Sequence, residues 1–215
     1  MSCRQCEAIE TKFDWKNAAK ELENYRKKGP DETTRILIDA LKAEGVDGMT
    51  LLDVGGGVGA IQHELLQAGV SSCINAEAST AYIEAAKEEA NRQNHADRIS
   101  HIQGNFVDKA ADIPESDIVT LDRVICCYHD VDALVRTSSG LARRMYGVVY
   151  PRGTLLAKIV TALENLYFRV QRIPFRTFVH PPEVVESILR DQGFERRFYH
   201  EKGTWQVVVY GRTQP

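Results

Sequence analysis

Short apolar runs alternate with segments whose apolar residues recur every three or four positions. The apolar runs predict strands over residues 50–54, 72–77, 99–103, 117–121 and 153–159. The segments between them predict helices from the glycine loop to about residue 68, over 79–94 and over 131–144. Nearly continuous apolar strands between amphipathic helices are typical of a parallel sheet with helices on both faces.

The two ends of the chain have different patterns. Trp15, Ala18, Leu22 and Tyr25 form one stripe, which predicts a helix over 11–28, and Asp31 is placed to cap a second helix to about residue 44. Near the C-terminus, a predicted helix over 181–191 precedes two strands, 196–200 and 205–210, whose short connection makes them antiparallel neighbours. We therefore predict an α/β fold, a Rossmann-like three-layer sandwich. Its seven-stranded sheet has five parallel strands and a C-terminal antiparallel hairpin, with residues 1–48 as an N-terminal helical cap and 49–215 as the main domain.

Composition narrows the functional classes. The chain has 215 residues, 43% of them hydrophobic, and 27 basic against 30 acidic side chains give a net charge of −3. This composition is globular, and no apolar run approaches the ~20 residues of a membrane helix. The N-terminus lacks the apolar core of a signal peptide and the cysteine count, five, is odd. We expect a cytoplasmic protein with reduced thiols, no membrane association, and little affinity for nucleic acid. Cys3 and Cys6 have metal-ligand spacing but no second pair, so we expect no metal site.

A glycine-rich loop is the most informative stretch. Asp53 ends the first predicted strand, and Gly55, Gly57 and Gly59 follow before the next helix. Such a loop lets the backbone approach a nucleotide at the carboxyl end of the sheet. Glu77 stands 22 residues after Gly55, at the end of the second predicted strand, where a carboxylate can accept hydrogen bonds from ribose hydroxyls. The loop and the acid together predict a nucleoside-bearing ligand.

The loop also fits a dinucleotide fingerprint, so an NAD(P)-dependent oxidoreductase is one alternative. Two predicted helices before the first strand, and the lack of room for a separate substrate domain, oppose it. With these residues the sequence resembles the class I S-adenosylmethionine-dependent methyltransferases, over roughly residues 30–212. Within that family it looks most like small single-domain bacterial enzymes grouped with magnesium-protoporphyrin O-methyltransferases. The resemblance implies S-adenosyl-L-methionine as cofactor and a small-molecule acceptor, with oxygen the favoured acceptor atom.

The resemblance also assigns cofactor contacts by position. Asp53, Gly55, Gly57 and Gly59 match the family's acid-and-glycine motif, and Glu77, followed by Ala78, matches its ribose-binding acid. Asn105 and Phe106 follow the third predicted strand, where the family contacts adenine; many members carry Asp at the Asn105 position. Asp122, at the end of the fourth strand, is a candidate acceptor from the ammonium group of the cofactor, or a salt-bridge partner of Arg123.

The loop after the fourth strand holds the catalytic candidates. His129 could serve as general base because imidazole titrates near neutrality, and Tyr128 could line the methyl-transfer channel or contact the sulfonium by cation–π attraction. The alternatives are that His129 begins a helix beside a capping Asp130 and that Tyr128 is a packing residue. Adjacent Cys126 and Cys127 could line the same pocket or simply pack.

A segment with interleaved aromatic residues and arginines, 161–180, is a candidate substrate cap. Aromatic rings stack on planar molecules and guanidinium groups clamp carboxylates, so the segment suits a planar or anionic substrate. The same chemistry contacts RNA, which makes an RNA methyltransferase a second alternative. The third interpretation is an amphipathic connector that packs its aromatic residues and leaves its arginines in solvent.

Overall fold

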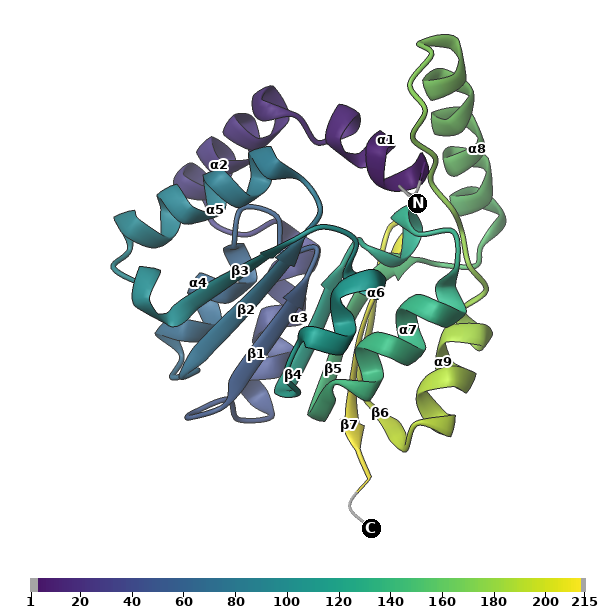
Figure 1. The fold of residues 1–215 in the computed structure, drawn as a ribbon. Helices are drawn as coiled ribbons and strands as arrows, with labels where there is room; N and C mark the ends of the chain where they lie inside the picture. The colour runs from purple at the N-terminus through teal and green to yellow at the C-terminus, as the bar shows by residue number, and fades with distance from the viewer. Residues whose placement is uncertain (1–3, 214–215) are drawn as a thin grey trace.

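Seven strands form one sheet in the order β3-β2-β1-β4-β5-β7-β6 (Figure 1). The computed structural model describes residues 4–213, with side chains from Ala8 onward. The strands are β1 (Thr50–Val54), β2 (Ser72–Glu77), β3 (Ile99–Gln103), β4 (Ser116–Asp122), β5 (Ala142–Pro151), β6 (Phe194–Lys202) and β7 (Trp205–Arg212). The first five pair in parallel, and β7 runs antiparallel between β5 and β6. The predicted seven-stranded sheet with a terminal hairpin is confirmed.

Helices cover both faces of this sheet, which confirms the three-layer prediction. α3 (Glu32–Ala43) and α4 (Ala60–Gln67) bury one apolar stripe each against one face. α7 (Val131–Gly140) and α9 (Pro182–Asp191) do the same on the other face, beside the short α6 (Phe106–Lys109). The chain passes from β3 back to β4, next to β1, so the strand order reverses between β1 and β4. At such a switch point the loops diverge and leave a crevice at the carboxyl ends of the strands.

The fifth strand lies earlier in the chain than predicted. The structure ends α7 at Gly140 and forms β5 over Ala142–Pro151, whereas the sequence pattern predicted a helix over 131–144 and a strand over 153–159. Residues 145–151 are buried on both faces of the sheet, so they show no alternation. Residues 155–159 instead begin α8 (Leu155–Val170), which is capped by the Thr154 side chain accepting from the Ala157 N–H.

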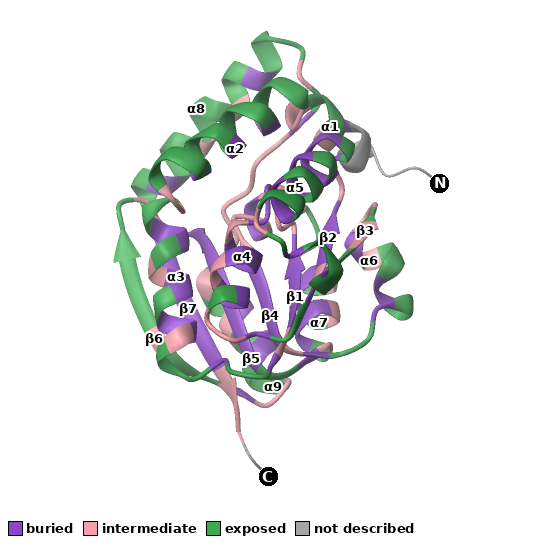
Figure 2. Cartoon of the chain, turned by 90° about the vertical axis from the view of Figure 1, so that its left-hand side faces the viewer, coloured by how far each residue is buried: buried purple, intermediate pink, exposed green. Residues whose placement is uncertain are grey.

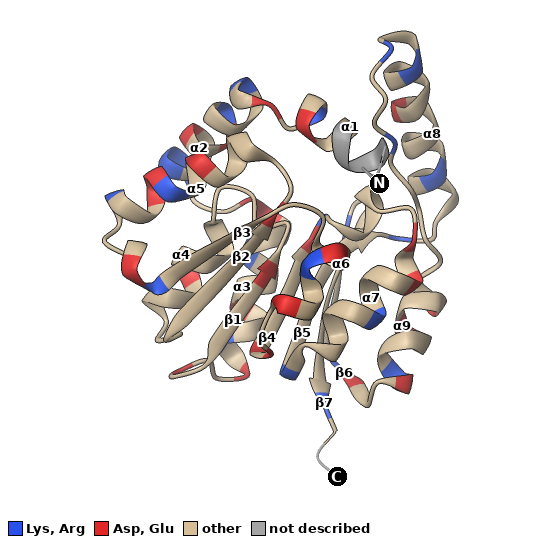
Figure 3. Ribbon diagram, in the orientation of Figure 1, with Lys and Arg blue, Asp and Glu red and all other residues tan. Residues whose placement is uncertain are grey.

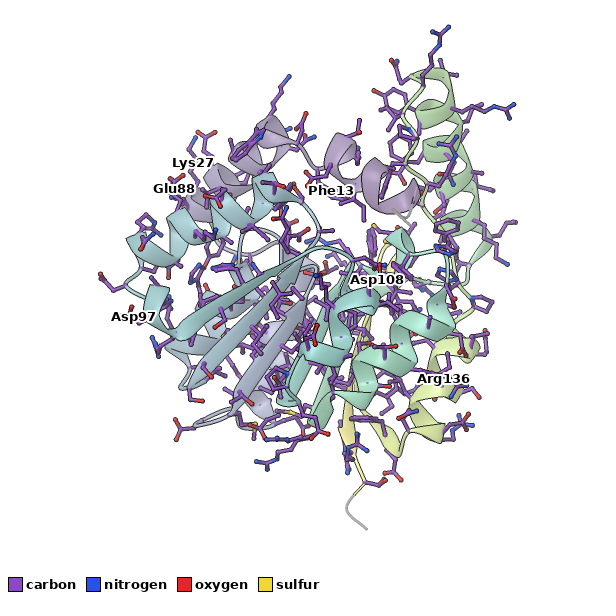
Figure 4. All side chains as sticks on the ribbon, viewed as in Figure 1. Phe13, Lys27, Glu88, Asp97, Asp108 and Arg136 are labelled. Atoms are coloured by element: carbon purple, nitrogen blue, oxygen red, sulfur yellow. The ribbon has the colours of Figure 1, made fainter. Side chains whose placement is uncertain are left out.

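The N-terminal part forms two helices where one was predicted over 11–28. α1 (Arg4–Lys12) and α2 (Trp15–Lys28) are separated at Phe13, because Asp14 caps α2 by accepting a hydrogen bond from the Asn17 N–H at 2.9 Å. α2 lies along α5 (Thr80–Arg92), where Figure 4 labels Lys27 and Glu88. The predicted domain division at residue 48 stays a prediction. No helix in residues 4–213 is long and apolar enough to cross a membrane.

Candidate active site

A cleft of about 620 Å³ lies at the carboxyl end of the parallel strands. The glycine loop and the ends of β2 and β4 form its floor, while α1, α2 and α8 form its walls. The predicted cofactor residues that line it are Asp53, Gly55, Gly57, Glu77, Ala78, Asn105, Phe106 and Asp122. Gly59, also predicted to bind the cofactor, is not among the described residues that line the cleft, and it caps α4 in the left-handed conformation. Residues from four separate parts of the sequence thus meet in one cleft.

The glycine loop follows a path that side chains would obstruct. Gly55 and Gly57 have φ angles of +67° and +57°, which favour glycine. Gly56 is needed for a different reason, since a Cβ there would lie 2.3 Å from Gln62 Nε2, 2.6 Å from Asn75 Oδ1 and 2.7 Å from Asp53 Oδ2. The loop therefore rests directly on a layer of buried polar groups.

Asp53 holds that layer together. Its two carboxylate oxygens accept hydrogen bonds from Thr120 Oγ1 at 2.7 Å and from Gln62 Nε2 at 3.1 Å, and the residue is 1% exposed. Burial raises the pKa of Asp53 to about 7, although both hydrogen bonds oppose the shift. Both carboxylate oxygens are thus engaged in the buried layer beneath the glycine loop.

Glu77 connects the second strand to the glycine loop. Its Oε2 accepts a hydrogen bond from the Gly57 N–H at 3.1 Å, and its Oε1 accepts one from the Ser79 N–H at 2.8 Å. Burial raises the pKa of this carboxyl, while the backbone donors lower it. These two bonds fix the carboxylate at the edge of the cleft.

The third strand supplies the far wall of this half of the cleft. Asn105 begins α6 without using its side chain as a cap, and both Asn105 and Phe106 line the cleft. The Gly104 N–H donates to the Glu77 carbonyl at 3.0 Å, which ties this turn to the end of β2. An amide side chain beside an aromatic ring is a suitable surface for a purine base.

Glu21 of α2 was not predicted, although it lies over the glycine loop. Its Oε1 would be 3.4 Å from a Cβ at Gly57, and its Oε2 accepts a hydrogen bond from Tyr82 Oη at 2.8 Å. Desolvation by the surrounding residues raises the pKa of the Glu21 carboxyl, although the side chain faces the open cleft. A signal was present in the sequence, because Glu21 stands three residues after Ala18 and four before Tyr25, on the apolar stripe of its helix.

Asp122 and Arg123 join the cleft to α3. Asp122 accepts hydrogen bonds from Thr34 Oγ1 and from Arg123 Nε, and the Arg123 guanidinium also pairs with Asp31 at 2.9 Å. Arg123 has a φ of +60°, a backbone conformation that costs a non-glycine residue free energy. The salt bridge proposed for Asp122 as an alternative is therefore present, and its carboxylate still lines the cleft.

The two catalytic candidates differ in whether they line the cleft. Tyr128 lines the cleft, whereas the exposed His129 is not among the described residues that line it. The two rings stack with centroids 5.4 Å apart, and Asp130 caps α7 by accepting from the Ala133 N–H. Cys126 and Cys127 both line the cleft, and their sulfur atoms are 3.8 Å apart. No role of these residues follows from their placement alone.

The 161–180 segment forms the second half of α8 and an extended return. Phe168 and Phe175 are buried and pack edge to face, and Phe13, which Figure 4 labels, completes this aromatic group from the α1–α2 connection. Phe175 reaches the cleft, together with Val160 and Glu164 of α8. The Arg176 guanidinium donates to backbone carbonyls of its own turn, at Ile173 and Phe175. The outer end of the cleft is thus mainly apolar.

Electrostatics divide the cleft into two halves. Five acidic residues line the half nearest the glycine loop, against two cations, Lys20 of α2 and Arg123; the acids are Glu21, Asp31, Asp53, Glu77 and Asp122. Such a site favours a ligand that carries positive charge as well as hydroxyl groups. Among the described residues, no group of three or more His, Cys, Asp or Glu side chains could hold a metal ion. Cys3 and the Cys6 side chain lie outside the described part.

Most of the sequence matches the model of a known protein family. The family model described as an O-methyltransferase domain matches residues 10–166. No protein with a curated description matches the sequence.

Three solved structures illustrate the shared fold. The magnesium protoporphyrin IX methyltransferase of Synechocystis PCC 6803, with bound SAH, is 18% identical; the match covers 84% of this chain and 82% of that one, with a TM-score of 0.68. An O-methyltransferase family protein of Burkholderia thailandensis is 15% identical, with coverages of 95% and 63% and a TM-score of 0.70. An O-methyltransferase family 2 protein of Planctomyces limnophilus DSM 3776, in complex with apigenin, is 14% identical, with coverages of 86% and 63% and a TM-score of 0.61. The chain thus spans about three fifths of the length of the latter two.

Proposed function

Because the chain belongs to the O-methyltransferase domain family, we propose that it transfers a methyl group from S-adenosyl-L-methionine to an oxygen atom of a small molecule. The observation that carries the proposal is Glu77. Its carboxylate is bound to the glycine loop at Gly57 and stands at the edge of the cleft. That arrangement suits a nucleoside whose remaining part is cationic, because other carboxyl groups surround the same half of the cleft.

The residues present fit this cofactor. Glu77 would accept from the ribose hydroxyls, and Asn105 and Phe106 would hold the adenine. We propose that Glu21 accepts from the ammonium group, because its oxygen lies over the loop at Gly57. Asp122 already accepts from Thr34 and Arg123. When bound, the cofactor supplies an activated methyl group on a sulfonium sulfur.

The protein's part in the reaction is alignment and the exclusion of water. Tyr128 lies in the cleft between the strand ends and the apolar outer half, so we propose that its ring faces the methyl position. Phe13, Val160 and Phe175 would hold the acceptor and keep water away. The general-base role of His129 remains a proposal that requires its exposed ring to turn toward the cleft.

The acceptor class follows from the outer half of the cleft. Aromatic and aliphatic side chains line most of it, beside the Glu164 carboxylate, and Lys12, whose ammonium group lies 4.8 Å from the Phe168 ring, stands at its rim. These residues suit a planar molecule with an acidic group. We also propose a cytoplasmic location, which the thiols of Cys73 and Cys126, neither of them in a disulfide, support.

Radiolabelled S-adenosylmethionine tests the proposal. The protein is incubated with the labelled cofactor and a cell extract, and the products are separated into small molecules, RNA and protein. We expect label in the small-molecule fraction with the wild-type chain and little with Glu77→Gln. Label that is found only in RNA would instead establish the RNA methyltransferase alternative, and label in no fraction would refute the proposal.

A further inference from the structure

α8 turns most of its apolar side chains toward solvent. Within this helix, which the structure describes completely, Ala157 and Phe168 are the buried residues. The α8 stripe consists of eight large apolar residues that are 47–74% exposed: Leu155, Leu156, Ile159, Val160, Leu163, Leu166, Tyr167 and Val170. Figure 2 shows α8 largely in the colour of exposed residues. Scattered exposed apolar residues are ordinary, but a concentration of this kind marks an interaction surface.

The α8 stripe has the spacing of a helix–helix seam. At about 100° per residue, its eight members fall within a sector of roughly 140°. Five of them follow one another at alternating intervals of three and four: Leu156, Ile159, Leu163, Leu166 and Val170. This is the a/d pattern of a heptad repeat, whose knobs pack into holes of a second helix. The three charged residues of α8 lie outside the sector, and Figure 3 shows the helix mostly without charge.

The opposite side of α8 is already occupied by the protein's own body. Ala157, Thr161 and Glu164 face the cleft, Val160 lies at the boundary between the cleft and the stripe, and Phe168 packs on Phe175 of the return segment. The Asn165 side chain pairs with the backbone of Thr177 through two hydrogen bonds, of 2.8 and 3.0 Å. Rolling the helix to bury the α8 stripe would break these contacts. Because nothing within residues 8–213 covers the stripe, we look for its partner in a second molecule.

The size of the α8 stripe matches a dimer interface. Each member exposes on the order of 100 Å², so the stripe offers on the order of 800 Å² of apolar surface. This exceeds the largest apolar patch of a typical monomer, about 300–600 Å², and equals the ~800 Å² that one partner contributes to a standard interface. We propose that α8 packs against α8 of a second copy of this chain about a two-fold axis. In such an arrangement one self-complementary patch serves both subunits.

Measurement of mass in solution tests this pairing. We expect sedimentation of the purified wild-type chain at micromolar concentration to give twice the mass of one chain. Leu163→Glu places a charge at the centre of the stripe and should weaken association about 100-fold or more, giving a monomer. Leu163 does not line the cleft, so binding of S-adenosylhomocysteine and the circular dichroism spectrum should be unchanged and should verify folding.

Two control variants test whether loss of the dimer is specific to the α8 stripe. Lys158→Glu changes a charge on α8 outside the stripe, and Val184→Glu places a charge at an exposed apolar residue of α9 that is 39% accessible. Both should remain dimers. A monomeric wild-type chain, or a Leu163→Glu variant that stays dimeric, would overturn the proposal. A monomer that binds anionic lipid vesicles through α8 would overturn it in favour of a membrane surface as the partner.

Discussion

Replacing Gly56 by Ala should damage both the fold and the cofactor site. A Cβ at this position would lie 2.3–2.7 Å from polar atoms of Gln62, Asn75 and Asp53, well inside contact distance. These residues are at most 1% exposed and cannot move into solvent. Overpacking of a core costs about 1–3 kcal/mol, and a broken buried hydrogen bond costs about 1–3 kcal/mol more. We therefore expect Gly56→Ala to lose about 2–6 kcal/mol of unfolding free energy.

Urea unfolding measures this loss, and calorimetric titration measures the affinity for S-adenosylhomocysteine. Displacing the loop should weaken that affinity about tenfold or more. Gly140→Ala is the matched control, because a Cβ there meets nothing within 4 Å and the residue is helical. Alanine should stabilise that position by up to about 1 kcal/mol. If Gly56→Ala were as stable as wild type and bound the ligand equally well, the close packing of the loop on the Asp53 layer would be refuted.

Two further predictions concern protons and charge. Burial, together with neighbouring His95, lowers the pKa of His63 to about 4, so the unfolded chain takes up a proton below pH 6.5 that the folded chain excludes. Stability should therefore fall as pH falls from about 6.5 to 4, by up to about 1.4 kcal/mol per pH unit, and His63→Gln should flatten this slope in urea unfolding curves; equal slopes would contradict the assignment. Glu21→Gln should weaken S-adenosylhomocysteine binding about tenfold or more but leave 5′-methylthioadenosine, which lacks the ammonium group, unaffected. Glu23→Gln, on the outer side of α2, is the control, and equal losses for both ligands would remove Glu21 from the ammonium site.

The sequence predicted the cofactor half of the cleft because that half depends on local rules. Residues at the ends of adjacent parallel strands must meet, so Asp53, Glu77, Asn105 and Asp122 could be brought together from strand prediction alone. Four of the five parallel strands were placed correctly or within one residue at each end. Glu21 was missed because its place on the apolar stripe of α2 does not show that the helix folds over the glycine loop. That placement depends on long-range contacts such as the Tyr82 hydrogen bond.

The fifth strand was misplaced for a similar reason, because the local sequence does not show where an apolar run is buried. Residues 155–160 are as apolar as a buried strand, and periodicity alone cannot separate a buried strand from a helix in so short a run. The structure makes this run a helix whose apolar side faces solvent. A sequence-based interpretation assumes that apolar runs are buried within the chain itself. That assumption fails where, as we propose for α8, the burial partner is another subunit.

The most direct test of the account is calorimetric titration of the wild-type chain with S-adenosylhomocysteine and, separately, with NAD. We expect one S-adenosylhomocysteine bound per chain and no heat from NAD. We also expect Glu77→Gln, while still folded, to bind S-adenosylhomocysteine about 100-fold or more weakly, because this carboxylate would accept charge-assisted hydrogen bonds from the ribose. Binding of NAD without S-adenosylhomocysteine, or unchanged affinity in Glu77→Gln, would contradict the account.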